Sequence, residues 1–87
     1  MPDATLVAQV AEIVRHVGKF APDVVITAES RLVEELGVDS LDLVGVFLKI
    51  QDDLGVAIEE ADVPGLTRVG DLAAYIERRQ RAPSAAA

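Results

Sequence analysis

The chain contains no cysteine, a single histidine (His16) and only three aromatic residues among its 87 residues. Without cysteine, neither a disulfide framework nor a thiolate metal site can form. One histidine also argues against a histidine-based catalytic triad and against a histidine-rich metal centre. We therefore expect no catalytic residues and no metal ligands in this chain.

Long apolar runs are absent too, as is a basic start followed by an apolar stretch. The first absence argues against a membrane span and the second against a secretory signal peptide. A chain this short forms one small domain, which buries only a little over ~60% of its unfolded surface and is too small for a deep enzyme cleft. We expect a cytoplasmic protein with no membrane association.

Basic side chains are scarce, with eight Lys and Arg against fifteen Asp and Glu, and a net charge of -7. Nucleic-acid binding needs a basic face, so this balance argues against it. The excess is concentrated in residues 29–62, which hold ten acids and two bases. Such a segment suits basic protein partners, although it is also compatible with a charged surface that only keeps the protein in solution.

Apolar residues recur at helical spacing in three stretches, which predicts three longer helices over residues 5–17, 40–54 and 68–80. Gly18 suits the left-handed residue that ends the first of them, and Gly55 follows the second as its stop. Residues 19–30 are predicted to form a loop in which Val24 and Ile26 turn inward.

Shorter elements are predicted around these helices. Residues 31–36 suit one helical turn ended by Gly37, and residues 59–63 suit a short helix closed by Pro64-Gly65. The predicted fold is all-α, a four-helix bundle with three longer helices, one short helix and a long loop between the first two long ones. We expect one domain over residues 1–81 and a disordered tail over residues 82–87.

The segment Leu36-Gly37-Val38-Asp39-Ser40-Leu41-Asp42-Leu43 carries the most information. Asp39 is a good N-cap for the second long helix, because its carboxylate accepts from the free amides of the first turn. Asp42 then falls at the third helical position, where an acid can return the bond in a capping box. This places Ser40 on the first turn of the helix.

Helical geometry gives the second long helix two apolar stripes. The core stripe is predicted to contain Leu43, Val46, Phe47, Ile50 and Leu54. A second stripe beside Ser40 contains Leu41, Val44 and Leu48, with acidic residues around it. It is either a docking surface for a partner or a surface that the loop of residues 19–36 buries.

Ser40 itself has two interpretations. A serine at a helix start is usually only a cap, and a catalytic serine needs an adjacent base that this chain lacks. A serine that another enzyme modifies needs only exposure and local order, and the first turn of a helix offers both.

The segment from Leu36 to Asp42 resembles the L-G-x-D-S-L-[DE] signature of acyl carrier proteins, and the likeness extends over residues 5–80. The resemblance implies a four-helix bundle whose Ser40 receives 4′-phosphopantetheine from coenzyme A, with Asp39 aiding recognition by a phosphopantetheinyl transferase. It further implies that helix-face residues contact partner enzymes: Leu41, Asp42, Val44, Leu48 and Asp52.

Such a protein carries acyl groups as thioesters and is not an enzyme. The implied partners, besides the transferase, are an acyltransferase or other acyl-loading enzyme and a ketosynthase or other acyl-processing enzymes, and we expect the carrier to be a monomer. Tethering the acyl group on a flexible arm raises its effective concentration at each partner.

Three positions depart from the pattern of fatty-acid carriers, which usually have an acid at Gly45, a small neutral residue at Lys49 and often an acid at Gln51. These departures favour a specialised pathway such as polyketide biosynthesis. A peptidyl or aminoacyl carrier and a fatty-acid synthase carrier are alternatives, although Val38 before Asp39 argues against the peptidyl type. A helical interaction module whose serine is only a cap is a further alternative.

Overall fold

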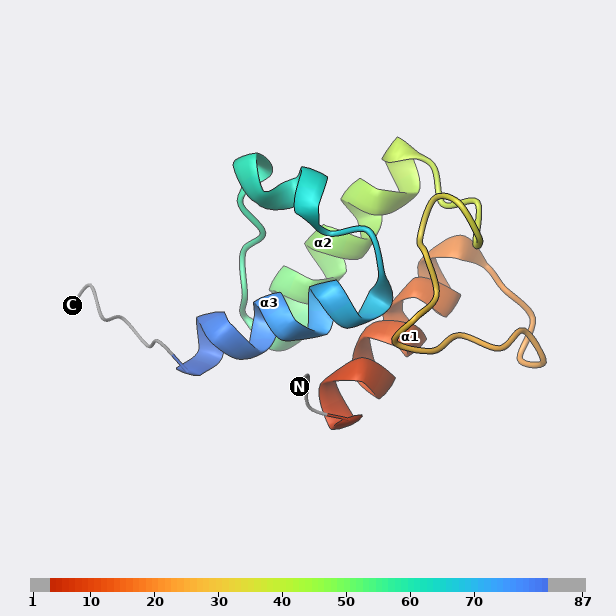
Figure 1. Cartoon of the computed structure of the whole chain (residues 1–87), viewed down its shortest axis with the longest axis horizontal. Helices are drawn as coiled ribbons and strands as arrows, with labels where there is room; N and C mark the ends of the chain where they lie inside the picture. The colour runs from red at the N-terminus through yellow and green to blue at the C-terminus, as the bar shows by residue number, and fades with distance from the viewer. Residues whose placement is uncertain (1–3, 82–87) are drawn as a thin grey trace.

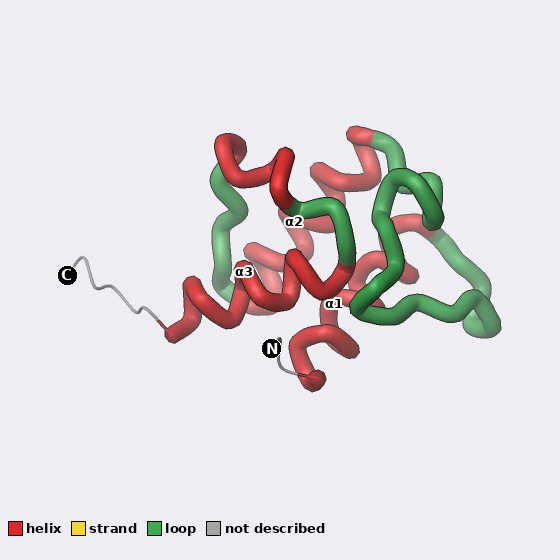
Figure 2. The backbone as a smooth tube through the Cα atoms, viewed as in Figure 1, coloured by secondary structure: helices red, strands yellow, loops and turns green. Residues whose placement is uncertain are grey.

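The computed structural model describes residues 4–81. It contains three α-helices and one 3-10 helix: α1 (Ala4–Gly18), α2 (Ser40–Leu54), η1 (Glu60–Gly65) and α3 (Val69–Arg81). Figures 1 and 2 show these helices and the long loop between α1 and α2, and no strand is drawn in the described part. The predicted all-α fold is confirmed, whereas the predicted tail over residues 82–87 lies outside the described residues.

The core lies where α1 packs against both α2 and α3. Figure 1 shows η1 on one side of the molecule and the loop between α1 and α2 on the other. Four residues of α3 are fully buried: Val69, Leu72, Ala73 and Ile76. None of the helices in residues 4–81 is long and apolar enough to cross a lipid bilayer.

The end of α1 differs from the prediction. The left-handed residue is Lys19, with φ 57°, while Gly18 is the last residue of the helix. A Cβ atom on Gly18 would lie 2.5 Å from Cε2 of Phe20, whose ring packs against the core. Gly18 therefore leaves space for this ring, and its prediction as the left-handed cap was wrong.

The loop between α1 and α2 is tied to the start of α3 by backbone hydrogen bonds. Leu32 N–H donates to Thr67 O (2.9 Å), and Gly70 N–H donates to Ala28 O (2.8 Å). A Cβ atom on Gly70 would lie 3.0 Å from that same carbonyl oxygen, so this close approach favours glycine. The loop is thus an ordered part of the fold, and Leu32 within it is fully buried.

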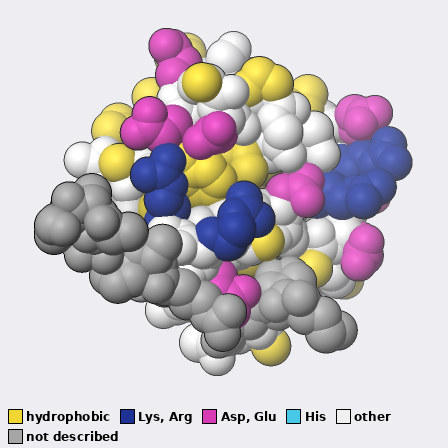
Figure 3. Space-filling view, turned by 60° about the vertical axis from the view of Figure 1, so that its left-hand side comes forward, with side chains coloured by type: hydrophobic (Ala, Val, Ile, Leu, Met, Phe, Trp, Pro, Cys, Tyr) yellow, Lys and Arg dark blue, Asp and Glu magenta, His cyan; other side chains and the backbone are white. Residues whose placement is uncertain are grey.

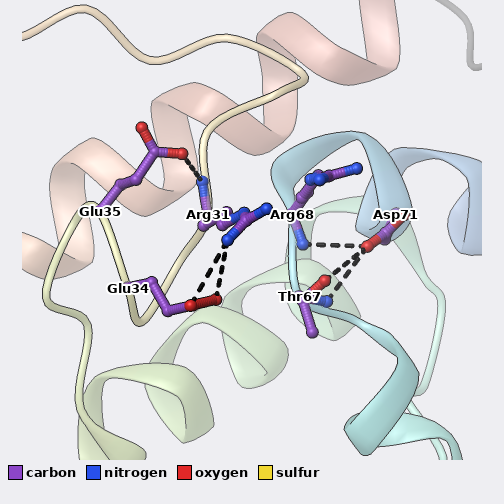
Figure 4. Close-up of polar contacts among 6 residues, drawn as sticks. All are labelled: Arg31, Glu34, Glu35, Thr67, Arg68 and Asp71. Carbon is purple, nitrogen blue, oxygen red and sulfur yellow. Dashed lines mark hydrogen bonds and ion pairs between the residues drawn. The ribbon is translucent and has the colours of Figure 1, made fainter.

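Side chains complete this junction (Figure 4). The Asp71 carboxylate accepts from the backbone N–H groups of Thr67 (3.2 Å) and Arg68 (3.0 Å) and from the Thr67 hydroxyl (3.1 Å), which caps α3. On the loop side, Arg31 N–H donates to Glu35 Oε1 at 3.0 Å. The turn over residues 31–36 forms as predicted, since Glu35 N–H donates to Arg31 O at 3.1 Å, the bond of one helical turn.

The short helix also differs in its bounds. η1 begins at Glu60 and includes Pro64 and Gly65, which were expected to close it. A 3-10 helix tolerates this proline because its φ of about -65° falls in the 3-10 range. The helix ends with Leu66 N–H donating to Val63 O at 2.9 Å.

Helix α2 has the bounds that were predicted, and Gly55 follows it in the left-handed conformation with φ 70°. Its core stripe is narrower than expected. Val46 and Ile50 are fully buried, while three predicted core residues are only half-buried, although they pack against the core: Leu43, Phe47 and Leu54.

Candidate functional site

Gly37 and Val38 direct the chain into the start of α2. Gly37 adopts φ 68°, a conformation that favours glycine, and a Cβ atom there would meet nothing within 4 Å. Val38 is buried at 2% exposure, and its N–H donates to Leu32 O at 2.9 Å. The turn and the buried anchor together fix where Asp39 and Ser40 emerge at the surface.

Asp39 is the N-cap of α2, as predicted. Its Oδ1 accepts from Asp42 N–H at 2.9 Å, and its carbonyl oxygen accepts from Leu43 N–H at 2.9 Å. The reciprocal bond of a capping box, from Asp39 N–H to the Asp42 carboxylate, is absent from the hydrogen bonds among residues 4–81. Both acids still lie at the positive end of the helix dipole.

Ser40 is the first residue of α2 and is exposed. Within residues 4–81 no side chain is hydrogen-bonded to its hydroxyl, so no internal base activates it. His16 lies elsewhere, in a hollow on α1 beside Glu12 and Phe20. The hydroxyl is therefore accessible to another molecule but not set up for catalysis by this chain.

A cavity of about 420 Å³ opens directly beside Ser40. Helix α2 and the η1 region form its two walls, and apolar side chains dominate its lining. The lining consists of Ser40, Leu43, Val44, Phe47, Ile58, Glu60, Val63 and Pro64. The half-burial of Leu43 and Phe47 follows, because both line this cavity.

The second apolar stripe of α2 is exposed. Leu41 has 82%, Val44 has 52% and Leu48 has 61% of its surface accessible. Of the two interpretations of this stripe, burial by the loop of residues 19–36 is therefore wrong. Three large apolar side chains beside an exposed serine form a surface suited to contact with another protein.

A second hollow, of about 660 Å³, runs between α1 and α2 and includes Leu48 and Asp52. Gly45 lies in it, where a Cβ atom would come within 3.0 Å of Val17 Cγ1. This close contact gives a packing reason for the glycine in mid-helix. Lys49, also in the hollow, pairs with Asp53 at 3.4 Å.

The structure thus brings Ser40 and Val44 to the cavity, and Leu48 and Asp52 to the hollow, while Leu41 projects into solvent and Asp42 is half-buried. Sequence reasoning missed the far wall of the cavity, formed by Ile58, Val63 and Pro64. The apolar residues on both sides of the acidic stretch from residue 59 to 62 were the only available signal.

Comparison with known proteins agrees with this geometry. The family described as "Phosphopantetheine attachment site" matches residues 5–76. The meromycolate extension acyl carrier protein of Mycolicibacterium aurum is 39% identical over 83 residues, which are 94% of this chain and 84% of the relative. The acyl carrier protein of Thermotoga maritima is 39% identical over 54 residues, which are 62% of this chain and 67% of the relative.

The chain therefore belongs to the acyl carrier protein family. Its cofactor is 4′-phosphopantetheine, and the chain is a carrier without catalytic activity of its own. Membership also implies work with a phosphopantetheinyl transferase and with acyl-processing enzymes.

Proposed function

We propose that this acyl carrier protein attaches its 4′-phosphopantetheine to Ser40 and presents acyl thioesters to enzymes of a specialised, polyketide-like pathway. The observation that carries the attachment site is the exposed Ser40 hydroxyl at the first turn of α2, beside an apolar cavity. In the modification, Ser40 Oγ would bond to the phosphorus of the pantetheine phosphate in coenzyme A, and adenosine 3′,5′-diphosphate would leave.

The residues around Ser40 fit this group. A phosphate at a helix N-terminus is stabilised by the helix dipole and by free backbone N–H groups. The apolar lining from Leu43, Phe47 and Val63 suits a hydrocarbon chain that extends from the arm. When attached, the group supplies a terminal thiol that forms the thioester with the acyl cargo.

The test of the proposal is the intact mass of the purified chain after incubation with coenzyme A, Mg²⁺ and a broad-range phosphopantetheinyl transferase. A gain of one phosphopantetheine, mapped to the peptide that holds Ser40, supports it. A chain that gains no mass while a known carrier in the same tube does would overturn it.

Partner recognition is proposed to lie on the exposed face of α2, with Asp42 and Asp52 as acidic contacts that steer basic partners. Leu48→Glu is expected to lower kcat/KM for acyl transfer to client enzymes about tenfold, because docking would bury an unpaired carboxylate at an apolar contact, and ~1.4 kcal/mol corresponds to tenfold. The matched control is Val25→Glu, which adds the same charge at a loop residue that is 77% exposed. Equal losses of kcat/KM in both variants would mean that partners respond to the net charge of the carrier and not to this face of α2.

The polyketide-like pathway is proposed because two residues of α2, Gly45 and Lys49, differ from those usual in fatty-acid carriers. The names of relatives support a second candidate, meromycolate extension by fatty-acid enzymes, because several relatives are called meromycolate extension acyl carrier proteins. The packing of Gly45 against Val17 offers a reason for the glycine that is independent of any partner.

Substitution on α2 separates the two candidates. Gly45→Glu/Lys49→Ala is expected to raise acyl loading by fatty-acid enzymes and to lower loading by polyketide enzymes, by several-fold in each case. Lys49→Ala alone is the control, since it leaves the contact with Val17 unchanged. Equal rates for all three proteins with both enzyme sets, at matched salt, would remove the support for a polyketide-like pathway.

A further inference from the structure

A polar cluster joins η1 to α3 outside the lining of the cavity. Its centre is the hydroxyl of Tyr75, a residue that is only 5% exposed. This hydroxyl donates to Asp62 Oδ2 at 2.8 Å and accepts from Glu59 N–H at 3.1 Å. One phenol on α3 therefore binds both the residue that precedes η1 and a residue within it.

Arg79 completes the cluster from the next turn of α3. Its Nη2 donates to Tyr75 Oη at 2.8 Å and lies 3.6 Å from Asp62 Oδ2 and 4.0 Å from a carboxylate oxygen of Glu59. The same guanidinium lies 5.0 Å from the centroid of the Tyr75 ring. Arg79 thus holds the tyrosine and the two acids together, with all the donors and acceptors of the hydroxyl in use.

The rest of η1 is weakly held. None of its six residues is buried, and its internal backbone bonds are those of a single short 3-10 segment. Figure 3 shows acidic and basic side chains gathered around an apolar area on this side of the molecule. A segment with so few buried contacts depends on its polar tethers for its position.

The position of η1 in turn sets the width of the cavity. Glu60, Val63 and Pro64 all belong to η1 and all line the cavity opposite α2. We propose that Asp62, Tyr75 and Arg79 form a latch that holds η1 at a fixed distance from α2 and thereby limits the length of acyl chain that the cavity shelters. The limit on acyl-chain length rests on the proposed attachment of the arm to Ser40.

These three residues are positioning residues, because they do not line the cavity themselves. Releasing the latch lets η1 swing away from α2, so the cavity accepts a longer chain at the cost of local order. A purely structural role would instead lower the stability of the whole bundle without changing the chain length accepted.

The experiment compares the parent chain with Tyr75→Phe and Arg79→Gln. Tyr75→Phe keeps the buried ring and removes only the hydroxyl, so the core is preserved. Arg78→Gln is the matched control: Arg78 also lies over the Tyr75 ring, at 5.9 Å, but it has no hydrogen bond or ion pair with η1. Both arginine variants remove one charge from adjacent exposed residues.

The first readout is amide hydrogen exchange of the unmodified chain. Asp62 N–H donates to Glu59 O and Leu66 N–H donates to Val63 O, at the two ends of η1. Both N–H groups are expected to exchange about tenfold faster in Tyr75→Phe and Arg79→Gln than in the parent. The amides of α1 and α2 are expected to keep their rates, as is η1 in Arg78→Gln. Equal acceleration throughout the chain, or none in η1, would overturn the latch.

The second readout uses the modified chain loaded with acyl groups of six to fourteen carbons. In the parent, the chemical-shift changes of Phe47 and Val63 are expected to increase with acyl-chain length up to a limit and then stay constant. In the two latch variants this limit is expected to lie at a chain several carbons longer. The same limiting chain length in the parent and in both variants would overturn the proposal that the latch limits acyl-chain length. Failure of modification would contradict Ser40 instead, and the exchange result does not depend on it.

Discussion

Ser40→Ala is expected to gain no phosphopantetheine under conditions in which the parent chain is converted completely. Ser40 is exposed at the first turn of α2, and its hydroxyl has no hydrogen bond to a side chain within residues 4–81, so a transferase reaches it without unfolding the site. The substitution removes one oxygen atom and leaves the Asp39 cap intact. The loss should therefore be all-or-none and should not reflect a change in fold.

Ser30→Ala is the matched control for this result. Ser30 is a serine of the same chain that is only 9% exposed, and its Oγ accepts from Thr27 N–H at 2.9 Å. We expect Ser30→Ala to gain one phosphopantetheine as the parent does, by intact mass. A gain that persists in Ser40→Ala and disappears in Ser30→Ala would show that the site has been assigned to the wrong serine.

The elements that the sequence predicted well are those with local signals. Helix α2 begins and ends at the expected residues because Asp39 accepts from the first turn and Gly55 adopts a left-handed conformation. The position of the stripe beside Ser40 also follows from helical spacing, whereas its exposure, which the sequence left open, is seen only in the structure.

The elements that were missed depend on contacts between distant segments. Leu32 and Val38 belong to the core although no periodic pattern includes them, because the loop that carries them pairs with residues 67–70. Gly18 was misread because the ring of Phe20, two residues on, decides its role.

The candidate site divides in the same way. Asp39 and Ser40 could be placed from the sequence, since a cap and a first turn are local features. The cavity beside Ser40 could not be predicted from the sequence, because a hydrogen bond between Asp62 and Tyr75 holds its far wall in position. Asp62 and Tyr75 are thirteen positions apart in the sequence, and nothing in their spacing indicates that they meet.

Truncation of Leu32, a buried residue of the loop between α1 and α2, is expected to lower the stability of the fold strongly. Leu32→Ala is expected to lower the free energy of unfolding by about 2–5 kcal/mol, as buried leucine truncations do. Leu32 is fully buried, and its backbone joins Thr67 on one side and Val38 on the other. A domain of this size has only roughly 5–15 kcal/mol of stability, so a measurable fraction of the variant should be unfolded at moderate temperature.

Leu48→Ala removes the same atoms from a leucine that is 61% exposed on α2. Its urea midpoint is expected to stay close to that of the parent, with a free energy of unfolding changed by at most about 0.5 kcal/mol, because alanine is favourable in a helix and little burial is lost. The difference between the two variants measures what the loop contributes to the core. If both midpoints shift equally, the loop does not pack as the structure has it, and the path of residues 36–39 into Ser40 loses its anchor. Because Val38 N–H bonds to Leu32 O, a true loss at Leu32 should also slow modification of Ser40 in proportion to the fraction unfolded.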